Sequence, residues 1–417
     1  MNILLKSATI VDSSNKGLHL KKRDILIKNG SISSIASKIG TPVNTKEIKL
    51  KNLHVSIGWF DSSVSFGEPG YEERETIANG IATAAKSGFT DIILNPSSTP
   101  VPDSSSDIVF LKNAAQNKGV NLYPLGCLTN HAEGESLAEL FDMKNAGAVG
   151  FYDAKHPITN PNLLKIALQY TDSFEGLVYS YPLDKKIAGK GIVNEGAVST
   201  RLGLKGIPAL AEELQIVRDL FILEYAGGKL HIPTISTANG VKLIADAKKK
   251  GLNVSCSVAI HNLIFDDTVL HDFDSNYKVM PPLRTSKDCK ALIKGVNDGV
   301  IDFVTSDHTP INIENKKVEF DNADFGTIGL ESAFGSLNLL FGLEKTIKLL
   351  TKGRERYGLE TPKIKEGEKA FITFFNPDET FNFKKEDSIS TSKNSAFIGK
   401  ELKGKVYGII ANNKILF

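Results

Sequence analysis

The sequence predicts an α/β protein: a (β/α)8 TIM-type barrel with a small β-sandwich built from both chain ends. In the middle of the chain, short apolar segments alternate with helical stretches over roughly 270 residues, close to the ~250 residues typical of such a barrel. Both chain ends contain strand-like segments and turn residues instead. With 417 residues, 41% of them hydrophobic, the chain can form one large and one smaller domain.

The N-terminal segment, residues 1–55, is predicted to form an antiparallel sheet. Residues 24–27 and 32–35 are short apolar segments of strand length, and Asn29 and Gly30 lie between them. An Asn-Gly pair between two such segments indicates a β-hairpin, because both residue types adopt the positive φ angles of a type I′ turn at low cost.

The C-terminal segment has the same character. Residues 370–375 and 404–410 are apolar and strand-like, and turn residues separate them. Both chain ends are therefore predicted to build one β-sandwich. We assign residues 1–55 plus 360–417 to this sandwich and residues 56–359 to the barrel.

The central segment contains the apolar strands expected of a parallel barrel. They are residues 90–94, 147–151, 229–232, 252–255 and 301–305. In this fold the functional residues lie at the C-terminal ends of the strands. We therefore expect the active face where Asp61, Asp153, His231 and Asp307 fall.

Composition and charge argue against several classes of protein. The formal net charge is +2 and the lysines are scattered among acidic residues, so no surface for nucleic acid is expected. No apolar segment approaches the roughly 20 residues that span a bilayer, and the first residues lack the features of a signal peptide. We expect a cytoplasmic protein without a membrane partner.

The cysteines are Cys127, Cys256 and Cys289. They lie far apart in the sequence, which disfavours a disulfide framework and a thiolate zinc site.

Residues 60–70 carry the most specific motif. They read Phe-Asp-Ser-Ser-Val-Ser-Phe-Gly-Glu-Pro-Gly, which resembles the first barrel strand of the amidohydrolase superfamily, Phe-x-Asp-x-His-x-His-Leu-Arg-Glu-Pro-Gly. Further segments resemble the dihydroorotase branch and keep its order and approximate spacing. They are residues 88–90, 150–153, 194–196, 207–209, 211–213, 281–284, 298–302, 305–310, 325–326 and 329–331. The resemblance covers nearly the whole chain and implies the barrel fold.

In active members of this branch, the resemblance implies zinc ions held by histidines and aspartates. Zinc lowers the pKa of bound water from about 15.7 to about 7, which supplies a nucleophile for opening a cyclic amide. Carried over by position, the two aspartates are kept as Asp153 and Asp307. The histidine positions hold Ser63, Ser65, Tyr181 and Thr234. No two of the eight histidines form a His-x-His or His-x-x-x-His pair, so no other register restores the site, and no cofactor is expected.

The residues that bind substrate in the family change in parallel. An arginine and an asparagine that would grip the substrate carboxylate correspond to Gly67 and Ser97. A second asparagine and a histidine correspond to Met280 and Ile311. Loss of the guanidinium removes a bidentate charge-assisted contact worth about 1.5–3 kcal/mol. The pair Phe325-Gly326 is what remains of this shell.

The surviving Asp307 has two interpretations. It is catalytic only if the protein is active; otherwise we expect Asp307, like Asp153, to form a hydrogen bond with Ser63, Ser65 or Thr234. The two serines have no base in evident spacing, and a serine without an adjacent base is a weak nucleophile, so we interpret both as small polar filler.

Other titratable residues near the predicted active face have structural interpretations. His231, His261 and His308 follow three different strands, and zinc needs several converging ligands, so we expect these side chains to be packed or hydrogen-bonded. Carboxylation of Lys155 or Lys278 to bridge metal ions is not expected without imidazoles nearby.

Our leading interpretation is a dihydroorotase-like protein of pyrimidine biosynthesis that is catalytically inactive and structural or regulatory. The resemblance implies aspartate carbamoyltransferase as a partner, and we also expect a homo-oligomer. One alternative is an active dihydroorotase, which interconverts carbamoyl aspartate and dihydroorotate, or another cyclic-amide hydrolase that uses Asp307 without metal. Another alternative is a small-molecule sensor that uses the vestigial pocket.

Overall fold

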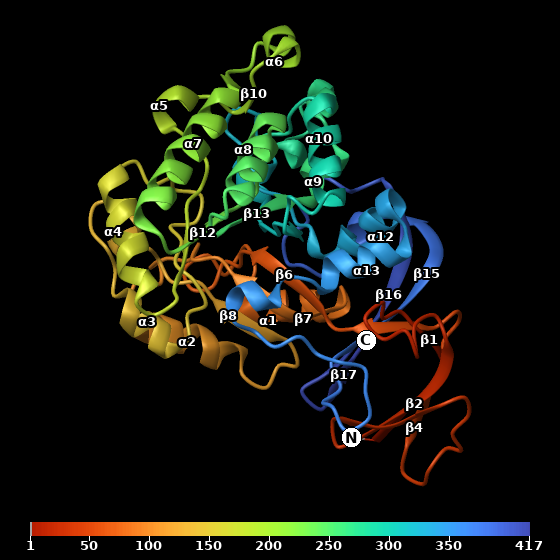
Figure 1. Cartoon of the computed structure of the whole chain (residues 1–417). Coiled ribbons are helices and arrows are strands. Elements are labelled where there is room, and N and C mark those ends of the chain that lie inside the picture. Colours follow the sequence, from red (N-terminus) through yellow and green to blue (C-terminus); the bar gives the residue numbers. More distant parts are fainter. Residues whose placement is uncertain (1) are drawn as a thin grey trace.

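A parallel β-barrel forms the centre of the computed structural model, which describes residues 2–417 (Figure 1). Its strands form two sheets, with the orders β6-β7-β8 and β14-β13-β12-β9. The strands of the first sheet are β6 Trp59–Val64, β7 Phe89–Leu94 and β8 Asn121–Pro124. Those of the second are β9 Leu177–Tyr179, β12 Lys229–Ile232, β13 Val254–Ala259 and β14 Phe303–Thr305.

Isolated β-bridges close the two sheets into a ring. Phe151 bridges to Gly126 on one side and to Val178 on the other, and Val64 bridges to His308. The strand expected at residues 147–151 is therefore reduced to one pairing residue. The reason is local, because helix α3 ends at Ala146 and Gly147 turns the chain with φ 109°, so little length is left for pairing.

Helices surround the barrel (Figure 1). Side-chain caps define the starts of several of these helices. Thr76 accepts a hydrogen bond from Asn79 N at the start of α1, and Thr285 and Asp288 form a capping box at α10. The α-helices are α1 Ile77–Lys86, α2 Ser105–Ala115, α3 Leu140–Ala146, α4 Pro161–Asp172, α5 Lys185–Ala188, α6 Ala197–Leu202, α7 Ala209–Ala226, α8 Ala238–Lys249, α9 Ile260–Ile264, α10 Ser286–Asn297, α11 Ile313–Lys316, α12 Leu330–Phe341 and α13 Leu343–Thr351. The shorter elements are η1 Asn130–Ala132, β10 Val193–Asn194, β11 Gly206–Ile207, η2 Asp267–Asp272, η3 Ser275–Tyr277, η4 Arg354–Tyr357 and η5 Lys385–Asp387.

The two chain ends build a separate sheet of eight strands, the terminal sheet. They are β1 Asn2–Ile10, β2 Lys22–Lys28, β3 Ser31–Ala36, β4 Lys46–Ile48, β5 His54–Ile57, β15 Ile372–Asn382, β16 Glu401–Ala411 and β17 Lys414–Leu416. Their order is β17-β16-β15-β5-β1-β2-β3, with β4 on β1, so β5 and β15 join the N-terminal and C-terminal strands. The expected hairpin lies between β2 and β3, with Asn29 at φ 49° and Gly30 at φ 79°. One face of this sheet encloses its own apolar core, which includes Ile25 and Phe374.

Trp59 links the barrel to the terminal sheet. Its buried ring lies 4.8 Å from Phe334 of α12 and 5.6 Å from Phe375 of β15, between ring centroids. Aromatic clusters of this kind contribute a large share of core burial. The junction is therefore part of a continuous apolar core, and its cluster also includes residues of the barrel strands and helices.

Removal of the Phe375 ring is expected to destabilise this junction. Phe375→Ala should lower the free energy of unfolding by about 3–5 kcal/mol, because it deletes a buried ring and leaves a cavity. The measurement is urea unfolding followed by the fluorescence of Trp59, the single tryptophan. Phe273→Ala, which truncates a ring that is 45% exposed, is the control and should cost less than about 1 kcal/mol. Equal losses for both variants would contradict the packing role.

Within residues 2–417, no helix is both long enough and apolar enough to cross a bilayer.

Candidate functional site

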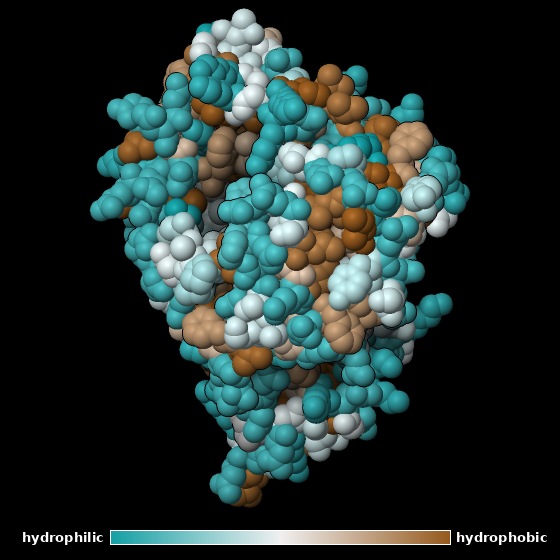
Figure 2. All heavy atoms as spheres, turned by 90° about the vertical axis from the view of Figure 1, so that its left-hand side faces the viewer, coloured by the Kyte–Doolittle hydropathy of each residue, from teal (hydrophilic) through white to brown (hydrophobic). Residues whose placement is uncertain are grey.

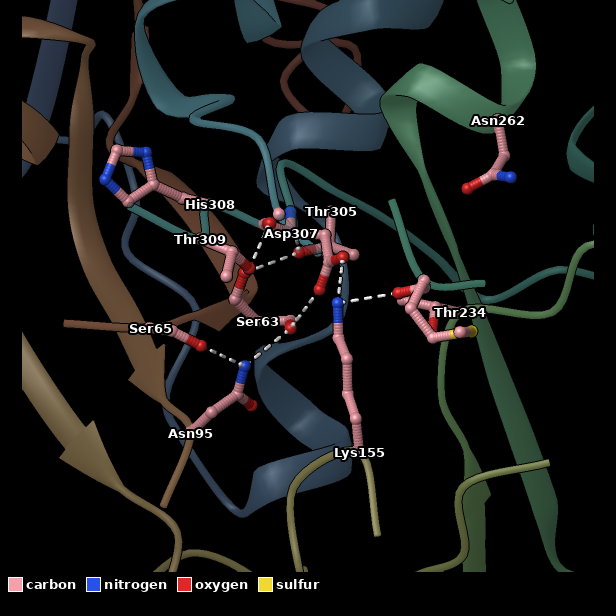
Figure 3. A network of polar contacts seen from close by, with 12 residues as sticks. Ser63, Ser65, Asn95, Lys155, Thr234, Asn262, Thr305, Asp307, His308 and Thr309 are labelled. Atoms are coloured by element: carbon pink, nitrogen blue, oxygen red, sulfur yellow. Dashed lines mark hydrogen bonds and ion pairs between the residues drawn. The ribbon is translucent and has the colours of Figure 1, made fainter. Parts of the chain in front are cut away.

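A polar network lies at the C-terminal ends of the barrel strands (Figure 3). Asp307 follows β14, and its side chain is 3% exposed. Its Oδ2 accepts a hydrogen bond from Lys155 Nζ at 2.8 Å, and its Oδ1 accepts one from Ser63 Oγ at 3.2 Å. Lys155 Nζ also donates to the Met280 carbonyl at 2.7 Å. The carboxylate is thus neutralised by an ammonium group from another loop, and the expected hydrogen bond to Ser63 is present.

Ser63 is in β6, and Ser65 directly follows Val64, the last residue of that strand. Because extended side chains alternate, residues two apart point to the same side. Asn95, which directly follows β7, donates from Nδ2 to Ser63 Oγ at 3.0 Å and to Ser65 Oγ at 3.2 Å. Ser65 N donates to the His308 carbonyl at 2.7 Å, which fixes this segment against the loop after β14. Figure 3 shows these side chains converging from three elements.

Asp153 forms its own hydrogen bonds, with partners that differ from those of Asp307. Its carboxylate accepts from Leu128 N at 2.8 Å, Thr129 N at 2.9 Å and Thr129 Oγ1 at 2.5 Å. Burial raises the pKa of Asp153, and the contacts from Thr129 oppose that shift. The sequence-based prediction placed hydroxyls of the barrel mouth around the carboxylates. For Asp153 the partner is instead the loop after β8.

Asp61 and His231 lie within strands and not at their C-terminal ends, contrary to the sequence-based placement. Asp61 is inside β6, where it accepts hydrogen bonds from Ser306 N and from the Thr305 hydroxyl. His231 is inside β12, where Nδ1 and Nε2 contact the hydroxyls of Ser255 and Ser257 at 2.9 and 3.2 Å. Both side chains are therefore used in contacts with neighbouring strands. Burial is the main cause that raises the pKa of Asp61 and lowers that of His231.

The other two histidines at this end of the barrel differ from each other. His308 and Glu75 form a fully buried pair, with Nε2 2.8 Å from the carboxylate, so His308 is hydrogen-bonded as expected. His261, at the start of α9, is also buried, but neither ring nitrogen has a hydrogen-bond partner among residues 2–417. Within the same described range, the Tyr181 hydroxyl and Thr234 Oγ1 are buried and lack partners as well. His261 was expected to be packed or hydrogen-bonded, and only the packing is present.

His261 is expected to make the stability of the protein depend on pH. Burial lowers the pKa of His261 from its ordinary 6.5 to about 4. The unfolded chain therefore binds a proton at a higher pH than the folded protein. The stability is complete above pH 6.5 and falls as the pH decreases toward 4, by about 2 kcal/mol between pH 7 and pH 5.

Urea unfolding at pH 7 and pH 5 measures this effect. His261→Gln should lose about 2 kcal/mol less than the natural protein over this interval, because the variant has no proton to bind at this position. His271→Gln, which replaces an exposed histidine in the same way, is the matched control variant. An unchanged pH dependence in His261→Gln would show that this imidazole titrates normally.

The predicted substrate-binding positions do not converge on Asp307 as a set. A Cβ on Gly67 would lie 1.8 Å from the Tyr71 carbonyl oxygen, so the turn occupies the space of a side chain. Ser97 Oγ is buried without a partner in the described chain. Met280 contributes its carbonyl to Lys155, whereas Ile311 lies on a cavity of about 660 Å³ outside the network.

The retained Phe325-Gly326 pair supports a neighbouring loop. Gly326 N donates to the Lys278 carbonyl at 3.0 Å, and Lys278 Nζ lies 5.0 Å from the centroid of the Phe325 ring. Lys278 Nζ also donates to the carbonyls of Phe320 and Asp321. This lysine is therefore used for loop structure.

The side chains of this network do not fit a zinc ion. Zinc prefers imidazole, thiolate and carboxylate ligands in a tetrahedral arrangement. The network offers the neutral hydroxyls of Ser63 and Ser65 and the carboxylate of Asp307, which is already paired with Lys155. Neutral hydroxyls are weaker zinc ligands than these groups, and the ammonium would repel a second cation.

Sequence analysis did not identify three side chains that define the site. Asn95 and Thr129 were not selected, and Lys155 was considered only as a carboxylated metal bridge. The position of Asn95 directly after a predicted strand is a signal that could have found it. The role of Lys155 depends on loop conformation, for which the sequence carries no comparable signal.

Comparison with solved structures tests the predicted fold. The L-hydantoinase (dihydropyrimidinase) of Arthrobacter aurescens has a TM-score of 0.84 at 21% identity, with 99% of this chain and 95% of that chain covered. The dihydropyrimidinase of Brevibacillus agri has a TM-score of 0.82 at 20% identity and covers 100% and 95%. At such identities the likeness concerns the fold alone, and the predicted (β/α)8 barrel is confirmed.

The family follows from the sequence comparisons. Residues 54–240 match the family described as dihydro-orotase-like. The dihydroorotase of Pelotomaculum thermopropionicum is 36% identical over 424 residues, with 100% of this chain and 98% of the relative covered. The dihydroorotase of Syntrophus aciditrophicus is 36% identical over 428 residues and covers 100% and 99%. The chain belongs to the dihydroorotase family.

Proposed function

We propose that this protein is a dihydroorotase-family member that does not hydrolyse cyclic amides and that has a structural or regulatory role in pyrimidine biosynthesis. The observation that carries the proposal is the contact between Lys155 and Asp307 at 2.8 Å. Asp307 is the position at which the family resemblance implies a metal-binding and proton-shuttling carboxylate. In this chain an ammonium group neutralises that carboxylate.

The chemistry of the reaction supports this proposal. Attack on an amide at neutral pH needs a strong nucleophile, which zinc-bound water supplies. At the positions where the resemblance implies histidines, this chain has Ser63, Ser65, Tyr181 and Thr234. Burial holds the pKa of the Tyr181 hydroxyl well above its ordinary value, so this group is a neutral phenol at pH 7 and not a phenolate ligand.

The residue at the predicted substrate-binding position 67 also supports the proposed loss of hydrolysis. The resemblance implies an arginine at position 67 that grips the substrate carboxylate. This chain has Gly67, and the Tyr71 carbonyl lies where a side chain would begin. Tyr71 N donates to the Gly67 carbonyl at 2.7 Å, so the turn is closed on itself. A carboxylate bound here would lack a bidentate cationic partner from this position.

Elemental analysis combined with a dihydroorotate assay tests the proposal. Protein purified at neutral pH should contain substoichiometric zinc and should not interconvert dihydroorotate and carbamoyl aspartate, with or without added zinc. A zinc-containing dihydroorotase assayed in parallel is the positive control. Near-stoichiometric zinc together with a turnover that Asp307→Asn abolishes would overturn the proposal.

The family resemblance supports aspartate carbamoyltransferase as the partner of a structural subunit. Size-exclusion chromatography of the two proteins from one organism, separately and mixed, tests this part. A joint peak and a change in the kinetics of the transferase are expected. Separate elution at micromolar concentrations would remove this partner from the proposal without affecting the zinc test.

A sensor function is a second candidate, because unpartnered buried polar atoms remain around the network. The Tyr181 hydroxyl and Thr234 Oγ1 have no hydrogen-bond partner within the described residues. Thr234 also has φ 47°, an uncommon conformation for a β-branched residue, and such strain concentrates at functional sites. A thermal shift with dihydroorotate or carbamoyl aspartate that Tyr181→Phe reduces would support this function. Identical melting with and without both ligands would exclude them as effectors.

A further inference from the structure

Lys316, the last residue of α11, lines the cavity of about 660 Å³ on which Ile311 lies. The side chain of Lys316 is buried. Its Nζ donates to the Asp324 carbonyl at 2.8 Å and to the Lys278 carbonyl at 3.2 Å. Both acceptors are neutral, and in the described chain no carboxylate shares a hydrogen bond with this amine. Because a buried ammonium without a carboxylate partner is costly, this position favours the neutral amine.

A second buried lysine, Lys278, strengthens this preference. Its Nζ lies 5.6 Å from the centroid of the Phe320 ring and 5.0 Å from that of the Phe325 ring. Aromatic faces stabilise an ammonium group, so Lys278 is the better placed of the two lysines to carry a positive charge. A charged Lys278 in turn disfavours a second ammonium at Lys316, since like charges in one site repel each other.

The protonation of Lys316 follows from these surroundings. Burial and the charge of Lys278 lower the pKa of Lys316 to about 7. Lys155 acts in the same direction, whereas Asp324 and Asp274 oppose the shift. About half of the Lys316 amines are therefore neutral at pH 7, compared with fewer than about one in 1,000 for a lysine with the ordinary pKa of about 10.4. The two N–H bonds of the neutral amine are used by the carbonyls, which leaves the lone pair of the nitrogen free to react.

The cavity beside Lys316 is polar. Apolar side chains gather on the face of the molecule that Figure 2 shows. The lining of the cavity differs from such a surface, because it includes three isoleucines and its remaining residues are polar or charged. Its volume of about 660 Å³ lies within the range of small-molecule sites, about 300–1,000 Å³. The cavity therefore has room for a polar small molecule beside a reactive amine.

Lys393 offers a positive charge in the same cavity. It is half-buried, and its Nζ donates to the carbonyls of Ser388 and Ser390. An ammonium group has three N–H donors, so one of them remains for a ligand. The exposed residues of the lining carry charges of both signs, which water screens; they are Glu73, Asp274, Glu314, Lys317 and Lys385. The less exposed part of the lining thus has amines as its charged groups, which favours an anionic ligand.

We propose that Lys316 binds aldehydes that carry a phosphate or carboxylate group and holds them as a covalent imine, with the anionic group at Lys393. A lysine that is desolvated, or that lies next to another cationic group, is a nucleophile for carbonyl compounds. The site lies outside the Asp307 network, so this proposal goes beyond the proposed function and does not depend on it.

Imine formation needs no further reactant. The lone pair of Lys316 Nζ attacks the aldehyde carbon, so that a C–N bond forms and the π bond of the carbonyl breaks. One proton moves from the nitrogen to the oxygen, which gives a carbinolamine. The hydroxyl then leaves as water with the second proton of the nitrogen, and the C=N bond forms. The products are the imine and one molecule of water.

Reductive trapping on the full chain tests the proposal. The protein is incubated at pH 7 with pyridoxal phosphate or with glyoxylate, the imine is reduced with cyanoborohydride, and peptide mass spectrometry locates the labelled lysines. Lys316 should be labelled at least about tenfold faster than exposed lysines such as Lys249, because about half of its amines are neutral. The rate at Lys316 should reach half of its maximum near pH 7. The probe that labels at the lower concentration identifies the preferred anionic group.

Two variants and a third probe are the controls. Lys316→Arg should abolish this label, because a guanidinium stays protonated and is not a nucleophile. Lys317→Arg changes the neighbouring exposed lysine of the same cavity and should keep the label at Lys316. Pyridoxal, which lacks the phosphate, should need an about two- to fivefold higher concentration than pyridoxal phosphate for half labelling, since it has no anionic group for Lys393.

Labelling that is spread over the exposed lysines, with Lys316 no faster than the others, would overturn the proposal. So would a rate at Lys316 that rises only above about pH 9, because the amine would then be an ordinary ammonium. Both measurements use the natural protein and do not depend on the folding of a variant. Equal half-labelling concentrations for pyridoxal and pyridoxal phosphate would overturn the pairing with Lys393.

Discussion

Replacement of Lys155 by methionine is expected to lower the free energy of unfolding by about 2–4 kcal/mol. The substitution leaves the Asp307 carboxylate, which is 3% exposed, with Ser63 as its remaining side-chain donor. Breaking a buried ion pair from one side costs about 3–5 kcal/mol. We expect a somewhat smaller loss, because Lys155 is 27% exposed and water can reach the position it leaves.

A double-mutant cycle separates the ion pair from the packing of the lysine stem. Lys155→Met combined with Asp307→Asn should recover part of the loss, because no unpaired charge is then buried. Lys250→Met is the matched control, since it removes the exposed contact with Glu224 and should cost less than about 1 kcal/mol. A loss in Lys155→Met no larger than in this control would mean that the ammonium does not stabilise Asp307. It would also weaken the proposed function, which rests on the neutralisation of Asp307 by Lys155.

Local sequence patterns predicted most of the barrel, because its strands, helices and turns each depend on residues that are close together in the sequence. Alternation of apolar strands and helices indicates a parallel barrel, and the Asn29-Gly30 pair indicates the hairpin of β2 and β3. The strand expected at residues 147–151 shows the limit of this reasoning. An apolar segment was present, but the position at which α3 ends left only Phe151 to pair.

The arrangement of the site could be predicted less well than its residue types. Ala154 has φ 50°, an uncommon conformation for a residue other than glycine, and it lies between Asp153 and Lys155. The chain therefore turns between the two side chains. Asp153 contacts the loop after β8, and Lys155 reaches Asp307. Asp307 itself has φ 46°. No residue type in this segment indicates such conformations, so the ion pair could not be predicted from spacing.

The buried ion pair at the other end of the first strands should have a larger effect. Arg354, at the start of η4, is 1% exposed. Its Nη2 donates to Asp91 Oδ2 and to the Gly58 carbonyl, both at 2.7 Å. Gly58 directly precedes β6, and Asp91 is within β7, so one guanidinium joins both strands to the segment after α13. Arg354→Met should lower the free energy of unfolding by about 3–5 kcal/mol, because it leaves the Asp91 carboxylate buried without a cation.

The size of this loss depends on the shape of the guanidinium as well as its charge. Arg354→Lys should retain part of the stability, because an ammonium keeps the positive charge but is a single point of contact that does not reproduce the planar fork. Asp91 would still accept hydrogen bonds from Asn121 Nδ2 at 2.9 Å and Tyr123 Oη at 3.2 Å, which limits the loss in both variants.

The control variant is Arg23→Met. Arg23 is half-buried and its Nη1 donates to the neighbouring Lys22 carbonyl, so this substitution should change the free energy of unfolding by less than about 1 kcal/mol. The order of unfolding midpoints in urea should therefore be Arg23→Met, Arg354→Lys and Arg354→Met, from highest to lowest. Equal midpoints for the two Arg354 variants would show that the charge is irrelevant and that this residue stabilises the barrel through its packing alone.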